Sequence, residues 1–468
     1  MGDTQIMPSE STNPASDATD HRDTLCIVGA GPHGLITARA ALKNGLKFEI
    51  IERHSDAGGL WDATNSGTPL YSSCHFISSK NASAYPEYPM PDDYPDYPSH
   101  HHILAYIRGF ARDFGIYPHI QFNTEVVSAA AAGDGTWLVT LSNGETRRYA
   151  GVVCCPGSNW HPRMPDLAGA FNGEIIHSRD YNDPSQFAGK RVLVIGLGNS
   201  GADIACDAAF AAEATFVSVR RGYHFVPKHL FGVPLVDFLH GVGHELVPPA
   251  MQGMDLGEIV AAITGDPSRF GLPKPDHALL ETHPLLNTQL LHYFSHGDAK
   301  AKGPVDRLDG DYVCFADGSR EKVDMVVCAT GYDYKIPFID EAEFDWVNGR
   351  PQFYMTAFHR KHPTLFALGL LEAGGVPYQQ MDDIANFIVQ QMRDRTVDPA
   401  RAALWDERVR TEQINLKEGV NYVDTPRTTN YVNVETLIRE IARLKGETGW
   451  KTADQPGYYD QLRTEHAQ

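Results

Sequence analysis

The residues with the clearest chemical potential lie in two glycine-rich stretches, GAGPHG at 29–34 and GLGNSG at 196–201. Each follows a short apolar run and opens a helical pattern, so the helix N-terminus would face a bound phosphate. In such a stretch the first glycine permits a tight turn, the second lets a pyrophosphate approach the backbone, and the third allows close packing of helix and strand. These three roles fall on Gly29, Gly31 and Gly34, and again on Gly196, Gly198 and Gly201. The sequence therefore predicts two dinucleotide sites.

The strands that follow the two stretches end in opposite charges. FEIIER places Glu52 at the end of the next strand, where a carboxylate can accept hydrogen bonds from both hydroxyls of a ribose. The first site therefore fits FAD or NAD. ATFVSVRRG places Arg220 and Arg221 at the equivalent position, where guanidinium groups would bind a 2′-phosphate that a carboxylate would repel. The second site favours NADP(H), and the alternative interpretation is a solvated basic pair at the end of a strand.

The two stretches belong to a longer internal repeat. Alternating strands surround Asn143-Gly144 in WLVTLSNGETRRYAGVVCCPG and Asp317-Gly318 in YVCFADGSREKVDMVVCATG. Dipeptides of this kind between alternating apolar residues predict β-hairpins. A buried strand that ends at a glycine follows the hairpin in both copies. We therefore expect two related α/β units.

Composition excludes several classes of protein. The 468 residues are 42% hydrophobic and 21% charged, which is typical of a globular protein with two or three domains. A net charge of −19 would repel a phosphate backbone, so nucleic acid is not expected as a partner. Seven cysteines without a CxxC pair, and no secretory leader before the first motif, favour the cytoplasm.

The most apolar stretch, 230–250, is interpreted as a buried helix-and-loop insert. The alternatives are a substrate cover or a membrane-surface contact. No transmembrane segment is expected, because the stretch is interrupted within about 20 residues by Pro234, Asp237, His240 and His244. No metal site is expected either, since the consecutive histidines 100–102 cannot all face one metal from a regular element.

Two dinucleotides on one chain, one of them NADPH, imply hydride transfer to a bound flavin that lies between the two units. The electrons could then pass to a disulfide, a quinone or dioxygen. The absence of a CxxC pair removes the disulfide reductases from this set.

Between the two units, Phe171, Gly173, His177 and Tyr181 follow the pattern FxGxxxHxxxY. This motif resembles the identifying motif of the flavin-containing monooxygenases and of their relatives, the Baeyer–Villiger monooxygenases. The resemblance extends from about residue 24 to about residue 390, and includes GGLW at 58–61 and ATGY at 329–332.

The resemblance implies particular contacts with the cofactors. Gly59, Leu60 and Trp61, together with the backbone around Val126, would contact FAD. Asn199 and Ser200 would lie against the pyrophosphate of NADP. His177 would brace the linkage between the domains.

It also implies a reaction. In the family NADPH reduces FAD, dioxygen adds at the flavin 4a carbon, and the hydroperoxide gives one oxygen atom to a nitrogen or sulfur atom of a small substrate. In the Baeyer–Villiger relatives the peroxide attacks a ketone instead. Tyr181 stands where that branch usually has Trp, which favours the heteroatom oxygenases, although Asn182 follows where those enzymes commonly have Lys or Arg.

The position that faces the flavin differs from the family pattern. Many heteroatom oxygenases have Asn three residues before the lysine that matches Lys80, and this chain has Ile77 there. Ser78, Ser79 and Asn81 are the nearby polar side chains. Ser78 and Asn81 are therefore the candidate catalytic residues near the flavin.

The resulting expectation is an α/β protein with two Rossmann-like dinucleotide-binding domains, in which an NADPH domain is inserted into a discontinuous FAD domain. The expected boundaries are a disordered tail at 1–22, FAD domain at 23–163 and 326–468 with C-terminal helices, and NADPH domain at 164–325. Dioxygen and a small molecule are the expected partners, and homo-oligomerisation is left open. The alternatives to a monooxygenase are an NADPH-dependent flavin reductase or oxidase and a non-enzymatic NADPH-sensing regulator.

Overall fold

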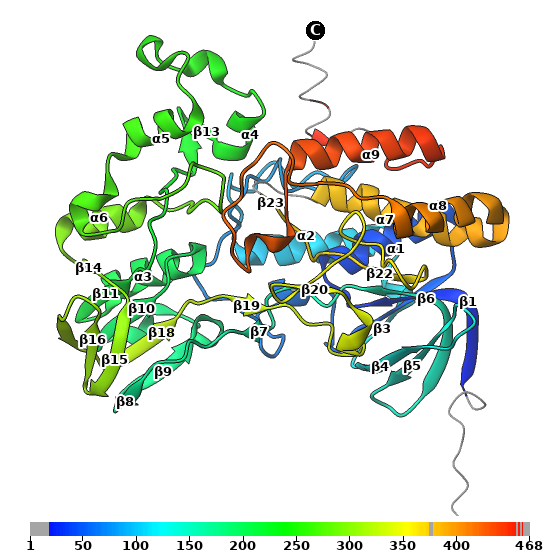
Figure 1. Cartoon of the computed structure of the whole chain (residues 1–468), viewed down its shortest axis with the longest axis horizontal. Helices are drawn as coiled ribbons and strands as arrows, with labels where there is room; N and C mark the ends of the chain where they lie inside the picture. Colours follow the sequence, from blue (N-terminus) through cyan, green and yellow to red (C-terminus); the bar gives the residue numbers. More distant parts are fainter. Residues whose placement is uncertain (1–17, 374–377, 455–456, 459–460, 462–468) are drawn as a thin grey trace, which may run out of the picture.

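Two sheets, one mixed and one parallel, each flanked by helices, form the body of the chain (Figure 1). The structure is a computed structural model that describes residues 18–373, 378–454, 457–458 and 461. In Figure 1 the first sheet lies on the right, in blue and cyan, and the second lies on the left, in green. We refer to them, with their helices, as the first unit and the second unit.

The first unit is built on a sheet with the strand order β3-β2-β1-β6-β5-β4, to which β22 adds by pairing with β6. Strands β1, β2, β6 and β22 run parallel, whereas β4 and β5 pair antiparallel. The strands are β1 (Thr19–Val28), β2 (Phe48–Ile51), β3 (Ile120–Gln121), β4 (Val126–Ala131), β5 (Trp137–Leu141), β6 (Thr146–Cys154) and β22 (Leu365–Ala367).

Helices from both ends of the sequence cover this sheet. Helix α1 packs against α7 in the largest hydrophobic cluster of the described chain. Because α7 comes from the C-terminal part of the sequence, the first unit is assembled from two separate stretches of chain. Its helices are α1 (Pro32–Asn44), α2 (His100–Asp113), α7 (Tyr378–Val397), α8 (Pro399–Thr411) and α9 (Val434–Thr448).

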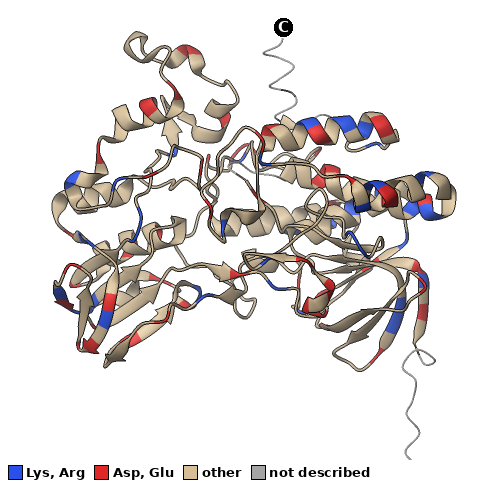
Figure 2. Cartoon of the chain, in the orientation of Figure 1, with Lys and Arg blue, Asp and Glu red and all other residues tan. Residues whose placement is uncertain are grey.

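Helix α9 illustrates how sequence pattern produces these elements. Leu437, Ile441 and Leu444 recur at helical spacing and are buried, while charged residues of both signs alternate on the other face (Figure 2). The side chain of Asn433 caps the N-terminus by accepting from the Glu435 amide, and Gly449 ends the helix in the left-handed conformation. These are the signals that start and stop an amphipathic helix.

The second unit has a fully parallel sheet with the order β14-β11-β10-β18-β9. Helix α3 follows the second glycine-rich loop, and α6 packs beside it. The elements are β9 (Glu174–His177), β10 (Arg191–Ile195), α3 (Asn199–Ala211), β11 (Ala214–Ser218), α6 (Gln289–His296), β14 (Ala299–Lys302) and β18 (Met325–Cys328).

Smaller sheets and two-stranded ribbons complete the fold. A four-stranded sheet adjoins the second unit, and the ribbon β7–β19 lies where the chain passes from the first unit to the second and back. The strands of the small sheet are β8 (Gly169–Phe171), β15 (Val305–Gly310), β16 (Tyr312–Phe315) and β17 (Arg320–Lys322). The ribbons pair β7 (His161–Pro162) with β19 (Tyr332–Asp333), β20 (Trp346–Val347) with β21 (Arg350–Pro351), and β23 (Glu372–Ala373) with β24 (Tyr431–Val432).

A long insert separates β11 from α6 and projects from the second unit (Figure 1). Its elements are β12 (His229–Leu230), β13 (Val233–Pro234), α4 (Leu235–Leu239) and α5 (Leu256–Thr264). The stretch 230–250 is therefore a short hairpin, one helical turn and loops. None of the helices in the described residues is long and apolar enough to cross a bilayer.

The structure confirms both predicted hairpins, but the strands that follow the turn differ between the two copies. Gly144 and Gly318 occupy the turns at positive φ, between β5 and β6 and between β16 and β17. In the first copy the second and third expected strands are one long strand, β6. In the second copy they split between two sheets, because β17 pairs in the small sheet and β18 in the parallel sheet.

Two expected boundaries were wrong. Residues 19–22 belong to β1 and not to a tail, because Thr19–His21 pair with the extended N-terminal half of β6. Residues 1–17 lie outside the described chain. The boundary between residues 325 and 326 cuts β18, which pairs with β10 and β9 and so belongs to the second sheet.

Candidate active site

The first glycine-rich loop joins β1 to α1 as a tight cradle. Gly29 has a φ of 108°, and a Cβ there would lie 2.6 Å from the Cys155 carbonyl oxygen. A Cβ on Gly34 would lie 1.9 Å from the Gly29 carbonyl oxygen. At Gly31, by contrast, a Cβ would meet nothing nearer than the Cα of Gly59, 3.6 Å away. Gly29 and Gly34 thus fix the loop, while Gly31 leaves its backbone bare for a phosphate.

Glu52 is anchored beside this loop with its side chain 5% exposed. One carboxylate oxygen accepts from the Ala30 amide at 2.6 Å, and the other accepts from the His54 amide at 2.7 Å. Each oxygen keeps a further lone pair for a ribose hydroxyl. The Thr124 amide donates to the Glu52 carbonyl at 2.9 Å. This bond places the backbone just before Val126 beside Glu52, at the end of β2.

The turn at Gly58–Trp61 lies directly on the first loop. The Gly58 amide donates to the Ala30 carbonyl at 3.1 Å, and Gly59 forms the contact with Gly31. Leu60 and Trp61 follow in a short 3₁₀ turn. The elements predicted to hold FAD are therefore in contact with one another.

An aromatic cluster extends from this turn. The ring centroid of Trp61 lies 5.2 Å from that of Phe76, and Phe76 lies 6.2 Å from Tyr378 at the start of α7. His33, in the first turn of α1, packs edge-on against Tyr378. Burial lowers the pKa of His33 to about 4, so its ring is neutral near pH 7. The cluster offers flat apolar surfaces suited to a planar ring system.

The second glycine-rich loop repeats the geometry of the first. Gly196 has a φ of 100°, and a Cβ there would lie 2.6 Å from the Ala329 carbonyl oxygen. A Cβ on Gly201 would lie 2.2 Å from the Gly196 carbonyl oxygen. At Gly198 the space is open, with only the tip of Arg427 within 4 Å. The two loops are therefore equivalent cradles on two different sheets.

Two polar residues of this second loop have different environments. The side-chain oxygen of Asn199 accepts from the Leu286 amide at 3.0 Å, so this side chain holds the insert. Ser200 is exposed at the open side of the loop. Of the two, Ser200 has the side chain free for a ligand.

Both helices that begin at the glycine-rich loops have a bare N-terminus. Gly31 and Gly198 are the N-caps of α1 and α3, and neither helix has a side-chain cap or an acidic residue in its first turn. The first amides of a helix need acceptors, and the helix dipole favours a negative charge there. The residues present therefore fit the diphosphate groups of two dinucleotides.

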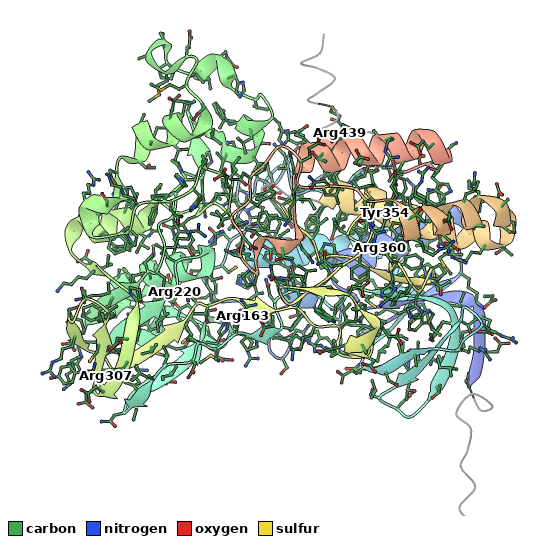
Figure 3. The ribbon with its side chains drawn as sticks, in the orientation of Figure 1. Arg163, Arg220, Arg307, Tyr354, Arg360 and Arg439 are labelled. Carbon is green, nitrogen blue, oxygen red and sulfur yellow. The ribbon has the colours of Figure 1, made fainter. Side chains whose placement is uncertain are left out.

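Arg220 and Arg221 differ in availability. The Nε of Arg221 donates to Asp276 Oδ1 at 2.8 Å. Arg220 is exposed beyond the end of β11, and no hydrogen bond or ion pair engages it within the described chain. The Gly196 amide donates to the carbonyl of Ser218 at 3.1 Å, which places the end of β11 beside the loop. Arg220, labelled on the left in Figure 3, is thus a cation at this edge that is free within the described residues.

The motif at 171–181 ties the two units together. His177 accepts from the Arg179 amide through Nδ1, so its Nε2–H donates to the Gly331 carbonyl at 3.0 Å. Its ring packs edge-on against Tyr332. Burial lowers the pKa of His177, which keeps the ring neutral. His177 thus holds the point where the chain returns to the first unit.

Tyr181 acts through helix α3. Its hydroxyl donates to Asp207 Oδ2 at 2.8 Å, and the hydroxyl of Ser73 donates to the same oxygen at 2.6 Å. One turn earlier, Asp203 accepts from the Tyr71 hydroxyl at 3.0 Å. Asp203 and Asp207 therefore fasten the 71–73 loop of the first unit to the second unit.

The predicted flavin-facing segment follows this loop. Ser78 is 3% exposed, and its hydroxyl has no hydrogen-bond partner in the described chain. Asn81 is exposed, and the Lys80 ammonium donates to the carbonyls of Asp92 and Tyr94. Ile77 is half-buried. The Ser78 hydroxyl is therefore enclosed by protein, whereas Asn81 is open to a ligand.

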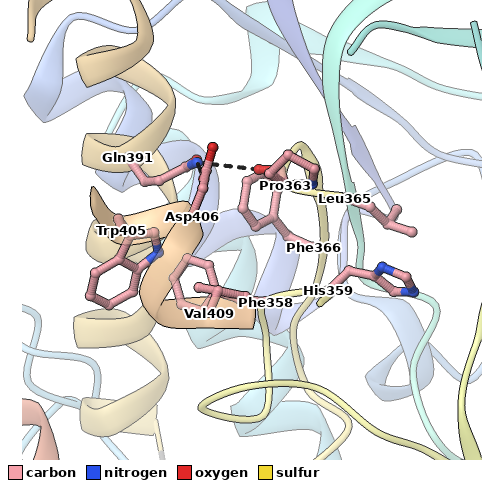
Figure 4. Close-up of a pocket in the computed structure, with 9 residues that line it drawn as sticks. All are labelled: Phe358, His359, Pro363, Leu365, Phe366, Gln391, Trp405, Asp406 and Val409. Atoms are coloured by element: carbon pink, nitrogen blue, oxygen red, sulfur yellow. Dashed lines mark hydrogen bonds between the residues drawn. The ribbon is translucent and has the colours of Figure 1, made fainter. Parts of the chain in front are cut away.

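A small pocket lies elsewhere, between β22 and helices α7 and α8 (Figure 4). Its free space of about 10 Å³ is enough for at most one water molecule. The amide of Gln391 crosses it and donates to the Pro363 carbonyl at 3.2 Å and to Asp406 at 3.0 Å. No predicted cofactor residue lines this pocket, so it is a packing defect and not the active site.

Sequence reasoning missed several of these residues. The spacing of Asp203 and Asp207, four residues apart on a predicted helix, could have indicated two carboxylates on one face. Phe76, Tyr378 and Arg427 carry no comparable signal, because their neighbours are far away in the sequence.

The fold and the two cradles define a class of α/β protein that binds two dinucleotides. The sequence profile of the flavin-binding monooxygenase-like family matches residues 22–448. The chain is 30% identical over 449 residues to flavin-containing monooxygenase 5 of Oryctolagus cuniculus, covering 90% of this chain and 82% of the relative. It is 32% identical over 445 residues to dimethylaniline monooxygenase [N-oxide-forming] 2 of Mus musculus, covering 89% and 82%.

A solved structure shows the same fold. The S-allyl-L-cysteine S-oxygenase of Allium sativum superposes with a TM-score of 0.63 at 19% identity, covering 96% of this chain and 93% of that one. The chain belongs to the flavin-binding monooxygenase-like family. It is an FAD- and NADPH-dependent monooxygenase, as the resemblance in its motifs predicted.

Proposed function

We propose that the chain oxygenates a nitrogen or sulfur atom of a small organic substrate, with FAD on the first unit and NADPH on the second. In this proposal, residues 19–163 and the described residues from 332 onward form the FAD domain. Residues 164–331 form the inserted NADPH domain. The ribbon β7–β19, through which the chain leaves the first unit and returns, supports this division.

Once reduced by NADPH, FAD supplies an activated oxygen atom that derives from dioxygen. The chain itself binds and orients. The backbone amides after Gly31 hold the FAD diphosphate, Glu52 accepts from the adenosine ribose, and the turn at Gly59–Trp61 closes over the loop. The second loop, from Gly196 to Gly201 with Ser200, holds the diphosphate of NADPH, and Arg220 binds its 2′-phosphate.

The observation that carries the heteroatom branch is Tyr181 at the last position of the motif, where the Baeyer–Villiger branch usually has Trp. The printed name of the mouse relative, an N-oxide-forming enzyme, supports the same branch. The hydroxyl of Tyr181 donates to Asp207, which also accepts from Ser73. Tyr181 therefore helps to hold the 71–73 loop in place. That loop leads directly into the buried segment with Ser78.

Positioning and exclusion of water are the main contributions expected from such a site. The bonds from Tyr71 to Asp203 and from Ser73 to Asp207 keep the segment 77–81 fixed between the units. Ser78 and Asn81 stay the candidate polar groups of this chain near the flavin ring: the Ser78 hydroxyl is enclosed by protein, whereas Asn81 is exposed and open to a ligand.

A product panel tests the proposed reaction. The FAD-loaded protein is incubated in air with NADPH and, in turn, a tertiary aromatic amine, an alkyl aryl sulfide and a cyclic ketone. We expect an N-oxide or a sulfoxide as the main product. A lactone as the main product would instead assign the Baeyer–Villiger reaction, and hydrogen peroxide equal to the NADPH consumed, without product, would assign the flavin oxidase alternative.

Arg220 is expected to set the preference for NADPH over NADH. A charge-assisted contact to a phosphate contributes roughly 1.5–3 kcal/mol, or about 10- to 150-fold, and Arg220→Ala should lose most of it. Arg221→Ala should lose less, because Asp276 already engages Arg221. The measurement is kcat/KM for flavin reduction with each coenzyme.

Arg307 provides the matched control. It is an exposed arginine of the small sheet, paired with Asp306, and lies at the lower left in Figure 3. Arg307→Ala should leave the coenzyme preference unchanged. If Arg220→Ala keeps the wild-type preference, Arg220 is a solvated surface charge and another group reads the 2′-phosphate.

A further inference from the structure

Arg427 lies opposite the second glycine-rich loop, although it comes from the C-terminal segment that follows α8. A Cβ on Gly198 would lie 3.8 Å from Arg427 Nη1, and among the described residues no other atom outside the adjacent backbone lies within 4 Å. Gly198 is the N-cap of α3 and carries no capping side chain. A guanidinium group therefore lies close to the helix N-terminus.

The segment that carries Arg427 is held firmly. The Nε of Arg350 donates to the carbonyl of Pro426 at 2.9 Å. Thr425 and Thr428 exchange hydrogen bonds, with the amide of each donating to the hydroxyl of the other at 3.1 and 3.2 Å. These bonds surround Arg427 on both sides. Its position is thus set by the fold, as a preorganised binding group requires.

Positive charge is in excess where the two units meet. Arg163 and Arg427 both act on Arg350 there, and the carboxylates that pair with the three arginines are Asp333 and Glu372. The Nη1 of Arg350 is buried and has no acceptor in the described chain, and the residue is 4% exposed. Burial, with contributions from Arg163 and Arg427, lowers the pKa of Arg350. Such surroundings favour an anionic ligand.

Glu372 holds Arg427 in the structure. Its Oε2 accepts from Arg427 Nε at 3.0 Å, and the side chain of Tyr431 also forms a hydrogen bond with Arg427. The side chain of Arg427 is 46% exposed, so solvent and a ligand can reach it. Arginine suits this task because its planar fork can bind two phosphate oxygens at once.

We propose that Arg427 is a binding residue for the diphosphate of NADPH, completing from the C-terminal segment a site that begins at the second glycine-rich loop. The inference rests on the proposed placement of NADPH on the second unit. In this proposal the bound coenzyme contacts two parts of the chain: the glycine-rich loop of the second unit, and the segment with Arg427, which Arg350 and β23 of the first unit hold in place.

The test compares binding of two dinucleotides that share a diphosphate and differ in the 2′-phosphate. Dissociation constants of NADP⁺ and NAD⁺ are measured by calorimetry on the FAD-loaded oxidised protein. Arg427→Gln should weaken both by a similar factor, about 10- to 100-fold. Arg220→Ala should weaken NADP⁺ alone. Arg439→Gln is the matched control, because Arg439 is also an exposed arginine paired with a glutamate, Glu418.

FAD content and the unfolding temperature without coenzyme show whether a variant folds. Arg427→Lys keeps the charge but loses the fork, so it should bind both dinucleotides with intermediate affinity. Unchanged affinity in Arg427→Gln, or a loss confined to NADP⁺, would overturn the inference. If Arg220→Ala binds NADP⁺ as tightly as the wild type does, the proposed placement of the coenzyme is wrong, whatever the result for Arg427→Gln.

Discussion

Replacing Gly29 by alanine should yield a folded protein that is purified with little or no FAD. The backbone of Gly29 has a φ of 108°, which an L-residue adopts at a cost of about 1–3 kcal/mol. The added Cβ would also lie 2.6 Å from the carbonyl oxygen of Cys155, so the loop must move. Because the loop holds the diphosphate through its backbone, a shift of this kind removes the site. FAD per protein is read from the visible absorbance.

Gly196→Ala is the twin of this variant, since its φ of 100° and its 2.6 Å contact with the Ala329 carbonyl oxygen are nearly the same. It should retain FAD and lose NADP⁺ binding. Gly446, in α9, has no atom within 4 Å of an added Cβ, so Gly446→Ala should retain both ligands and gain about 0.5–1 kcal/mol of stability. If Gly29→Ala keeps its FAD and Gly196→Ala loses it, the two sites have been assigned the wrong way round.

Removing one partner of the buried pair Arg39–Asp382 should lower the free energy of unfolding by about 3–5 kcal/mol. Arg39 of α1 donates to Asp382 of α7 at 2.9 Å, and the two side chains are 1% and 0% exposed. Arg39 also donates to the Pro86 carbonyl at 2.5 Å. Arg39→Ala leaves the buried Asp382 without its cation, and Asp382→Ala leaves Arg39 with only the longer 3.8 Å contact to Glu87, between the helices that close the first unit. Urea unfolding followed by circular dichroism gives the difference.

The double variant Arg39→Met with Asp382→Leu separates charge from packing. It removes both charges and keeps much of the volume, so it should be clearly more stable than either single variant. Lys47→Ala, which breaks the exposed pair with Asp23, should stay close to wild type. A double variant as unstable as the single ones would mean that the loss comes from packing and not from an unpaired charge.

The parts of the site that are local in sequence could be predicted from it. The strand, the glycine-rich turn and the helix that follows are contiguous, so the positions of Gly29 and Gly196 follow from the motif. Glu52 and Arg220 follow too, because each lies at the end of the next strand of a parallel unit. The two hairpin turns were predicted for the same reason, since Asn143-Gly144 and Asp317-Gly318 fix the backbone over a few residues.

Contacts between distant segments could not be predicted. Arg39 and Asp382 are separated by 343 positions, and each read alone is a charged residue in a helical pattern. Arg427 lies in a segment without periodicity or motif, and only the fold brings it to Gly198. Which sheet the strands β6, β17 and β18 join also depends on tertiary contacts. The same pattern makes one long strand in a single sheet and two short strands in different sheets.

Oxygen-18 labelling tests the central claim most directly. The FAD-loaded protein is given NADPH, ¹⁸O₂ and the sulfide or amine that it converts in the product panel, in ordinary water, and the product is analysed by mass spectrometry. A monooxygenase of this kind should place one labelled oxygen atom in each product molecule, with one NADPH consumed. Consumption of NADPH with all of the label recovered in hydrogen peroxide, or a product oxygen that derives from water, would contradict the account.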